Sequence, residues 1–464
     1  MQIKKLYPFY CFLFLLIFFC RNHIFFWDTY QLGAKQAWTL FENGLLNWRL
    51  PPEIDSGHPP IFGMYLAAFW RLFSPSLWVS HFAMLPFLIG VILYTFKIGC
   101  HLLDPTKAIY LILLLLADAI FIGQAILISP DVVLVFFFMM AIYAVFTDAS
   151  NLKIIAAIGL GLISMRGMMT LGAIILFDLW KDWKFSDFKK QLGKLFVYVP
   201  AIVTILFFLV LHYINTGWVG YHEESEWASA FKRVGFMGFL KNIGIYIWRL
   251  IDYGRIIIWI VLIAAIYKNS NFSKDKNLKA LFLLAGFTEI LIAPVLIMHE
   301  GLLAHRYLLP ITISLTILMW YAVFTAEFIK SQKNLIFTIV ITIMLIGNFL
   351  VYPRNIAQGW DSTFAHIPYY SLRKKMIEYI DSKGIEKSAI GTSFPNIGPL
   401  KYYDPELEGN GFPEMDFDAQ DYIFYSNVYN DFTDQQLEDL KANWEVEKCF
   451  GSLTVDVCLY KKIK

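Results

Sequence analysis

Long runs of apolar residues without charges recur along most of this chain of 464 residues. Buried helices of soluble proteins show a polar residue every few positions, whereas a membrane-spanning helix needs about 20 mostly apolar residues in a row. The composition agrees, because 58% of the residues are hydrophobic and 16% are charged, against about 25% charged in soluble domains. The sequence therefore excludes a single soluble globule and predicts a polytopic α-helical membrane protein.

Eleven segments qualify as membrane spans, with ends defined to within several residues. They are 7–26, 78–99, 108–126, 131–147, 152–164, 167–180, 195–214, 243–267, 280–298, 307–329 and 334–352. We treat the pair 152–164 and 167–180 as two short spans. A single helix there would move either Lys153 or the Lys-rich segment after Trp180 to the outer side, against the positive-inside rule.

Lysine-rich loops set the predicted orientation, since short cytoplasmic loops are rich in Lys and Arg. Lys4 and Lys5 place the N-terminus in the cytoplasm, and eleven spans then make every second loop basic. The first apolar run has no small-residue cleavage site after it, so we expect a retained span and not a signal peptide. We predict a multi-pass protein of the cytoplasmic (inner) membrane whose C-terminal segment is extracytoplasmic.

Two domains follow from this pattern: a membrane domain over 1–352 and a small α/β domain over 353–464. The membrane domain has two long outer loops, 27–77 and 215–242, and the first carries amphipathic stretches suited to the membrane interface. The second domain alternates helical and strand patterns. From Val351 onward there are 12 Lys and Arg against 18 Asp and Glu, so nucleic acid is not an expected partner.

Cysteine is sparse, with five residues in the whole chain. Cys449 and Cys458 flank a turn between two short strand patterns, and they can form a disulfide if the register sets them opposite each other in an oxidising compartment. The sequence leaves that question open. No C-x-x-C spacing of the kind that binds metal occurs.

Two carboxylates lie at the outer ends of predicted spans. Asp28 directly follows the first span, and Asp131 begins the fourth. Each has a structural alternative, because Asp28 could cap a helix over 29–41, and Ser129 or Asp131 could cap the helix that Pro130 begins. Their position at one membrane level on one side favours a shared site.

Cationic and titratable side chains are predicted on the same face. His58 ends the first outer loop in a Gly-His-Pro-Pro segment, Arg166 separates the two short spans, and His305 and Arg306 precede the tenth. A single Arg could simply reach lipid headgroups. Together with the carboxylates at an apolar boundary, they predict a site for a lipid-linked phosphate, whose oxygens guanidinium groups bind in a bidentate manner.

Four short motifs in this order resemble the glycosyltransferase C superfamily, and are most similar to its protein O-mannosyltransferase and lipid A aminoarabinose transferase group (family 39/83-like). The motifs are Asp28, His58-Pro59-Pro60-Ile61, Pro130-Asp131-Val132-Val133-Leu134 and Arg306-Tyr307-Leu308-Leu309-Pro310. Their order covers the membrane domain. Two departures are Thr29, where some relatives carry a second acid, and Arg166-Gly167-Met168, where many have Lys-Gly-Pro.

The resemblance implies an enzyme that moves a sugar from a polyprenyl-phosphate carrier to a protein, lipid A or envelope-glycan acceptor at the outer face of the membrane. It implies catalytic roles for Asp28, as general base or acceptor-orienting group, and for Asp131 in the same cavity. The donor phosphate would be contacted by His58, Arg166, His305, Arg306 and Tyr307.

Attack opposite the phosphate predicts inversion at the anomeric carbon, and a positioned carboxylate base contributes about 10² to 10⁴-fold. Asp28 and Asp131 could share a divalent cation, but Asp28 is followed by Thr29 and Tyr30, so no D-x-D motif begins at that position. We therefore expect no required cofactor and no metal.

The main alternative is a transporter or flippase for a lipid-linked glycan, in which Asp118, Asp252 and Glu289 would line a pathway. We expect Asp118 and Asp252 instead to lie near span ends or to pair with residues such as Arg249 and Arg255. A non-catalytic scaffold whose outer domain binds glycan is a third class.

Overall fold

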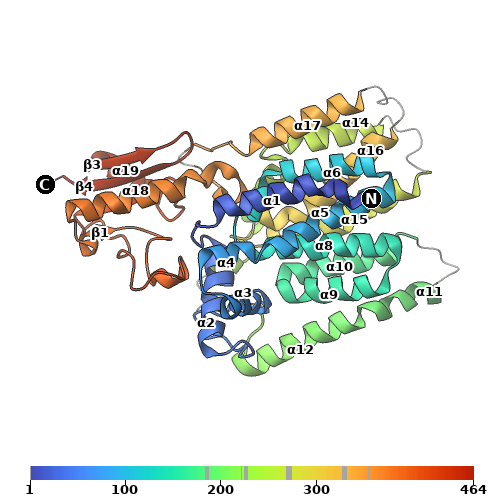
Figure 1. Ribbon diagram of the computed structural model, residues 1–464, viewed down its shortest axis with the longest axis horizontal. Helices are drawn as coiled ribbons and strands as arrows, with labels where there is room; N and C mark the ends of the chain where they lie inside the picture. The colour runs from blue at the N-terminus through green and yellow to red at the C-terminus, as the bar shows by residue number, and fades with distance from the viewer. Residues whose placement is uncertain are drawn as a thin grey trace.

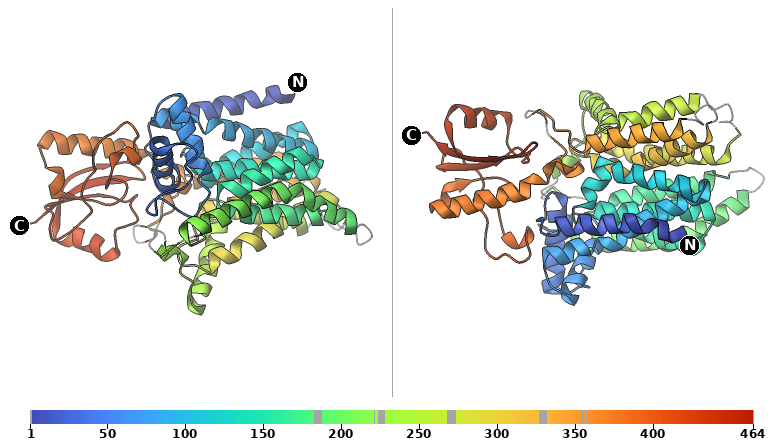
Figure 2. Two further views of the ribbon diagram at one scale, coloured as in Figure 1. Left: turned by 90° about the horizontal axis from the view of Figure 1, so that it is seen from below. Right: turned by 45° about the horizontal axis from the view of Figure 1, so that its top comes forward.

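The computed structural model describes residues 2–182, 188–220, 222–223, 228–267, 274–326, 332–353, 356 and 358–463. A bundle of roughly parallel and antiparallel helices forms one part of the molecule, and a small domain with a β-sheet forms the other (Figure 1). The N-terminus lies at the end of the bundle that is far from the C-terminal domain, as two further views confirm (Figure 2).

Each predicted span overlaps at least one helix of the structure. The helices concerned are α1 (Tyr7–Cys20), α5 (Leu85–Leu102), α6 (Pro105–Ala117), α7 (Ala119–Ala125), α8 (Pro130–Thr147), α9 (Ser150–Ile163), α10 (Met165–Trp180), α12 (Val199–Thr216), α13 (Phe236–Ile251), α14 (Ile256–Tyr267), α15 (Lys276–Ile297), α16 (Leu309–Thr325) and α17 (Lys333–Gly347). Short helices α4 (Leu77–Phe82) and α11 (Phe188–Gly193) precede α5 and α12.

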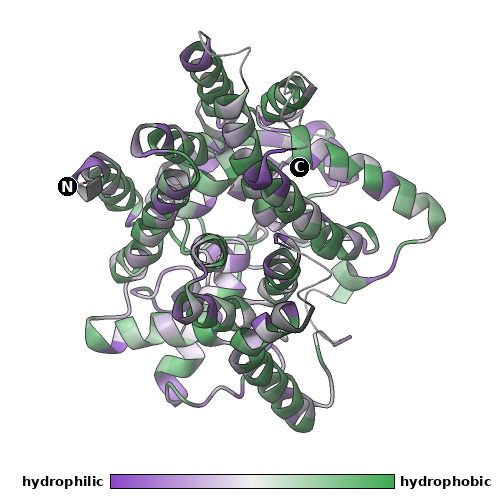
Figure 3. Ribbon diagram, turned by 90° about the vertical axis from the view of Figure 1, so that its right-hand side faces the viewer, coloured by the Kyte–Doolittle hydropathy of each residue, from purple (hydrophilic) through white to green (hydrophobic). Residues whose placement is uncertain are grey.

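Hydrophobic residues dominate these helices, including their outward faces (Figure 3). Among the described residues, five helices are long and apolar enough to cross a membrane, or up to seven if each of two bent pairs counts as one span. The protein is thus a multi-pass membrane protein, and the count of eleven crossings stays a prediction. The prediction of two separate helices over 152–180 is confirmed, because the chain is extended at Ser164 between α9 and α10.

Two predicted spans are not continuous helices. The segment 243–267 is divided between α13 and α14, whose axes differ by 82°, because Tyr253 and Gly254 both adopt positive φ angles, 51° and 82°. The segment 108–126 bends by 73° between α6 and α7. There Asp118 has an extended backbone and caps α7 with its side chain, which ends one helix and starts the next.

The first outer loop folds at the end of the bundle that faces the C-terminal domain (Figure 1). It contains the π-helical segment η2 (Tyr30–Lys35), α2 (Gln36–Asn43) and α3 (Ile61–Leu72). As the amphipathic pattern predicts, α3 buries one face, with Phe62, Leu66 and Trp70. The second outer loop is described only in part; it includes the 3-10 turn η5 (Ala228–Phe231) and continues into α13, which exposes Phe236 and Met237.

The C-terminal domain has a four-stranded sheet in the order β1-β2-β4-β3. Strands β1 (Ile390–Gly391) and β2 (Tyr422–Ser426) are parallel, while β4 (Asp456–Lys462) is antiparallel to β2 and to β3 (Trp444–Gly451). Helices α18 (Pro368–Lys383) and α19 (Asp434–Ala442) pack on the sheet. Cys449 and Cys458 are opposite each other in the β3–β4 hairpin and form a disulfide, which resolves the question that the sequence left open.

Contacts of the first outer loop, and of Phe26 just before it, join the two parts. Phe26 is buried in the core of the C-terminal domain, next to Tyr369 and Phe394. The indole Nε1 of Trp38 donates to the Lys401 carbonyl at 2.7 Å. The chain around Asp28 is therefore held between the bundle and the sheet domain.

Candidate active site

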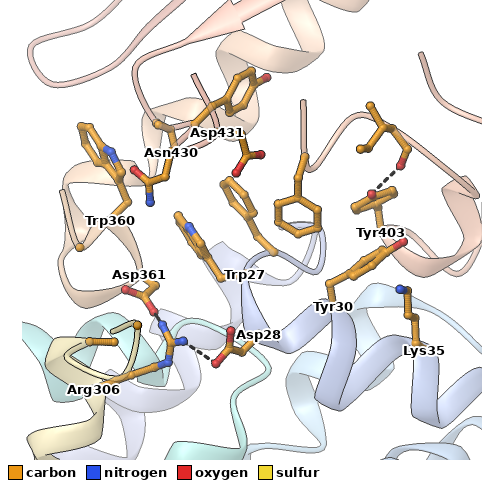
Figure 4. Close-up of a pocket in the computed structure, with 18 of the residues that line it drawn as sticks. Trp27, Asp28, Tyr30, Lys35, Arg306, Trp360, Asp361, Tyr403, Asn430 and Asp431 are labelled. Atoms are coloured by element: carbon orange, nitrogen blue, oxygen red, sulfur yellow. Dashed lines mark hydrogen bonds and ion pairs between the residues drawn. The ribbon is translucent and has the colours of Figure 1, made fainter. Parts of the chain in front are cut away.

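A cavity of about 1300 Å³ lies between the end of the bundle and the C-terminal domain. One wall comes from the first outer loop and the segment before α16, and the C-terminal domain forms the opposite wall. Figure 4 shows Asp28 and Arg306 on one side, Asn430 and Asp431 on the other, and Trp27 between them. Distant parts of the chain therefore build one site.

The guanidinium group of Arg306 lies at the centre of the charged network. Arg306 belongs to the 3-10 helix η6 (His305–Leu308) and is only 8% exposed. Its Nη2 donates to Asp28 and its Nη1 to Asp361, and its Nε lies 3.7 Å from Oδ2 of Asp131. One cation thus binds carboxylates from the first outer loop, the start of α8 and the segment after α17.

A second guanidinium group, that of Arg166, lies beside the first. Its Nη1 is 2.7 Å from Oδ1 of Asp131, and its Cζ is 4.0 Å from the centre of the Tyr307 ring. The Tyr307 hydroxyl donates to Asp28 at 3.3 Å. A guanidinium group has five N–H donors, and the ion pair with Asp131 uses one nitrogen of Arg166, so this residue retains donors for an oxyanion.

The structure shows that neither aspartate side chain caps the helix that it could have capped. The hydroxyl of Ser129 caps α8 by accepting the backbone N–H of Asp131, which leaves the Asp131 side chain for the arginines. No side-chain cap is present at the start of η2, and the Asp28 carboxylate accepts from Arg306 and Tyr307 instead. Both carboxylates therefore belong to the charged network.

His58 lies at the edge of this network. Its Nδ1 accepts the backbone N–H of Met165 at 3.3 Å, next to Arg166. Burial and the positive charge of Arg166 lower the pKa of His58 to about 4, against the opposing effect of Asp28 and Asp55. The imidazole is therefore neutral at pH 7, and its Nε2–H can donate a hydrogen bond.

We expect His58 to make folding stability depend on pH. Its folded pKa of about 4 lies below the ordinary value of 6.5, so the unfolded chain binds more protons between these values and stability falls as the pH drops from 6.5 toward 4. The His58→Gln side chain can still accept the Met165 N–H but does not titrate. The loss of folding stability that His58 causes on acidification should therefore disappear in this variant. Thermal unfolding between pH 7.5 and 5 tests it; parallel curves for the two proteins would contradict the assignment.

His305 takes part in a different network from its neighbour Arg306. Its Nε2 lies 2.8 Å from Asp252 and 3.1 Å from Nη1 of Arg249. Its Nδ1 packs against the Gly359 backbone, and a Cβ added at Gly359 would lie 2.6 Å from this nitrogen. His305 also lines the cavity, and its contact with a donor phosphate stays a prediction. Its ring supports the segment that carries Asp361.

The sequence analysis missed Asp361. Its carboxylate binds Arg306, and the residue is 5% exposed, in the 3-10 helix η8 (Trp360–Ser362). The available signal was its place shortly after the last predicted span, at the membrane level of Asp28. The amide of Gln124 in α7 donates to the Asp361 carbonyl at 2.8 Å and accepts from the Ser129 hydroxyl, so α7 positions this carboxylate.

Gly123 lets η8 approach α7, and we expect substitution there to displace Asp361. A Cβ at Gly123 would lie 2.8 Å from backbone atoms of Ser362 and Thr363, and such overpacking costs about 1–3 kcal/mol. Gly123→Ala should lower both thermal stability and activity. Gly286→Ala in α15 is the matched control, because no atom lies within 4 Å of its added Cβ; equal effects of the two substitutions would contradict this account.

The acidic residues considered for a transport pathway have local partners. Asp118 accepts from Arg255 at 2.9 and 3.0 Å, as the sequence predicts. Asp252 accepts from His305 and Tyr352, and Glu289 accepts from the Tyr246 hydroxyl at 2.5 Å. These pairs connect neighbouring helices, which accounts for the charges without a transport pathway.

The Arg306 guanidinium group supplies the positive charge next to both Asp28 and Asp131, the two residues considered for a shared divalent cation. In the part of the chain that the structure describes, no group of three or more His, Cys, Asp and Glu side chains is arranged to hold a metal ion.

No family model and no curated protein matches this sequence. Among solved structures, ArnT from Cupriavidus metallidurans bound to undecaprenyl phosphate is similar with a TM-score of 0.59 and 11% sequence identity. Its apo state is similar with a TM-score of 0.51 and 12% identity. Each match covers 99% of this chain and 98% of that chain. The chain therefore shares the fold of ArnT, helix bundle and C-terminal domain together.

Proposed function

We propose that this protein is an integral membrane glycosyltransferase that moves a sugar from a polyprenyl phosphate to an acceptor hydroxyl at the outer face of the cytoplasmic membrane. The observation that carries the proposal is the convergence of Asp28, Asp131 and Asp361 on Arg306, beside Arg166, at a cavity next to the bundle. ArnT, which shares the fold, is the protein bound to undecaprenyl phosphate.

The residue types suit this chemistry. The acceptor oxygen attacks the anomeric carbon while Asp28 takes its proton, and the bond from that carbon to the phosphate oxygen breaks. Charge grows on the departing polyprenyl phosphate, where Arg166 and Arg306 stabilise it in a site with little water. Asp28 becomes neutral when it accepts the proton, so its ion pair with Arg306 weakens. Arg306 can then stabilise the negative charge that develops on the departing phosphate. We expect inversion and no metal requirement.

The orientation supports the same proposal. The C-terminal domain lies at one end of the bundle and the N-terminus at the other (Figure 1), and the cavity lined by Asp28 and Arg306 is bounded by the C-terminal domain. If Lys4 and Lys5 lie in the cytoplasm, as the positive-inside rule predicts, the opposite end of the bundle faces outward. Nucleotide sugars are confined to the cytoplasm, so an outer transferase requires a lipid-carried donor.

The test uses purified protein in nanodiscs with polyprenyl-phosphate sugars of hexose, pentose and aminosugar type. Release of free polyprenyl phosphate, unaffected by EDTA, is the expected result. A transporter would move the intact donor across the membrane of a reconstituted vesicle without cleaving it. That outcome would overturn the proposal.

A further inference from the structure

Aromatic side chains from both walls, the first outer loop and the C-terminal domain, line a large part of the cavity. Tyr30 stacks on Tyr403 with ring centres 4.5 Å apart, and Phe394 meets Tyr30 edge to face at 5.2 Å. Tyr402 packs edge to face on Tyr30 at 5.9 Å, and Trp360 lines another side of the cavity (Figure 4). These mutual contacts fix the rings in place. Of these rings, Tyr402 and Phe394 are partly exposed, and fixed aromatic faces of this kind are suited to the C–H faces of pyranose rings.

Carboxylates of exposed residues line the same cavity. Glu53, Glu300, Glu414 and Asp431 line the cavity, and within the described residues none of them forms an ion pair. Asp431 lies close enough to Glu414 for their charges to interact. Such groups accept hydrogen bonds from hydroxyls or ammonium groups, and they repel phosphate and carboxylate ligands.

The size of the cavity also restricts the ligand. At about 1300 Å³, it exceeds the roughly 300–1000 Å³ of pockets for small molecules. It extends from Asp28 and Arg306 to Asn430 and Asp431 (Figure 4), so a ligand of several sugar units fits with one hydroxyl next to Asp28.

We infer that the acceptor is a saccharide of more than one unit that is uncharged or bears amines, and that it binds between the first outer loop and the C-terminal domain. This inference rests on the proposed transferase function. It assigns the C-terminal domain the role of acceptor selection, through Tyr402 and Phe394 for the sugar faces and Glu414 and Asp431 against anionic groups.

A glycan array tests the ligand class directly with the full-length protein in nanodiscs. The array carries neutral, aminated, phosphorylated and carboxylated oligosaccharides, together with Ser/Thr peptides. We expect binding to neutral or aminated glycans, and at least a tenfold loss of that binding in Tyr402→Ala. Tyr379→Ala, on α18 and outside the cavity lining, is the matched control. Preference for anionic glycans or peptides, or no glycan bound, overturns the inference.

Turnover then tests the role of the carboxylates. Phosphorylation of a bound glycan should lower kcat/KM at least tenfold, and the Glu414→Gln/Asp431→Asn double variant should reduce this discrimination severalfold. The exposed pair Glu438→Gln/Glu445→Gln is the charge-matched control and should leave it unchanged. If polyprenyl phosphate is released but the enzyme does not discriminate against phosphorylated glycans, only the acceptor inference fails. If polyprenyl phosphate is released neither by transfer to any acceptor nor by hydrolysis, the proposed function itself fails.

Discussion

Asp28→Asn is expected to lower kcat for sugar transfer by at least 10²-fold while the protein stays folded. The amide can still accept the Tyr307 hydroxyl that the carboxylate accepts now at 3.3 Å, but it cannot take a proton from the attacking hydroxyl. Release of polyprenyl phosphate from a purified donor measures the effect. Polyprenyl phosphate binding should persist, because Arg166 and Arg306 remain.

Asp131→Asn is the comparison for this experiment. Asp131 pairs with Arg166 at 2.7 Å and is 4% exposed, so its substitution should disturb arginine placement and donor affinity more than proton transfer. A near-normal kcat in Asp28→Asn, with thermal stability unchanged, would remove the general base from the mechanism.

Arg306→Leu is expected to destabilise the protein by about 3–5 kcal/mol and to abolish transfer. The substitution leaves Asp28, Asp131 and Asp361 close together without their shared cation, and breaking a buried ion pair from one side has a cost of this size. Arg306→Lys keeps the charge, but a single ammonium group cannot reproduce the fork that joins Asp28 to Asp361. It should recover stability in part and activity hardly at all.

A double variant separates stability from catalysis. Arg306→Leu/Asp361→Leu removes one of the uncompensated carboxylates, so its thermal stability should exceed that of Arg306→Leu, with no return of activity. Thermal unfolding in one detergent, together with donor turnover, provides both readouts. If Arg306→Leu is as stable as the unsubstituted protein, the three carboxylates do not depend on this cation.

Hydropathy located the helices well, because the apolar length of a span is a local property of the sequence. It failed where backbone geometry interrupts an apolar run. The bend of 82° after α13 depends on positive φ angles at Tyr253 and Gly254, next to Asp252. Hydropathy predicts a membrane span for an apolar run of this length, whether the run forms one straight helix or two helices with a sharp bend between them.

The site could be predicted in part. Membrane level and side brought Asp28, Asp131, Arg166 and Arg306 into one group, and the structure places all four in contact as a chain of ion pairs. The sequence could not predict the direction of each side chain. His305 and Arg306 are adjacent in sequence, yet His305 binds Asp252 and Arg306 binds Asp28.

Asp361 was missed for a related reason. It lies in a polar segment that sequence analysis assigned to the outer domain, and its link to Arg306 depends on how α7 packs against η8. That packing depends on Gly123 and Gln124, which lie inside an apolar run and gave no signal of their own.

The central claim is that the sugar–phosphate bond of a lipid-carried donor lies beside Asp28 and the two arginines. A cryo-electron microscopy structure with a polyprenyl phosphonate sugar, which cannot be cleaved at that bond, tests it most directly. The account predicts phosphonate oxygens within hydrogen-bonding distance of Arg166 or Arg306, the anomeric carbon facing the Asp28 carboxylate, and the lipid chain against the bundle. A phosphonate group bound elsewhere, with the Arg306 network intact and the cavity empty at saturating ligand, would contradict it.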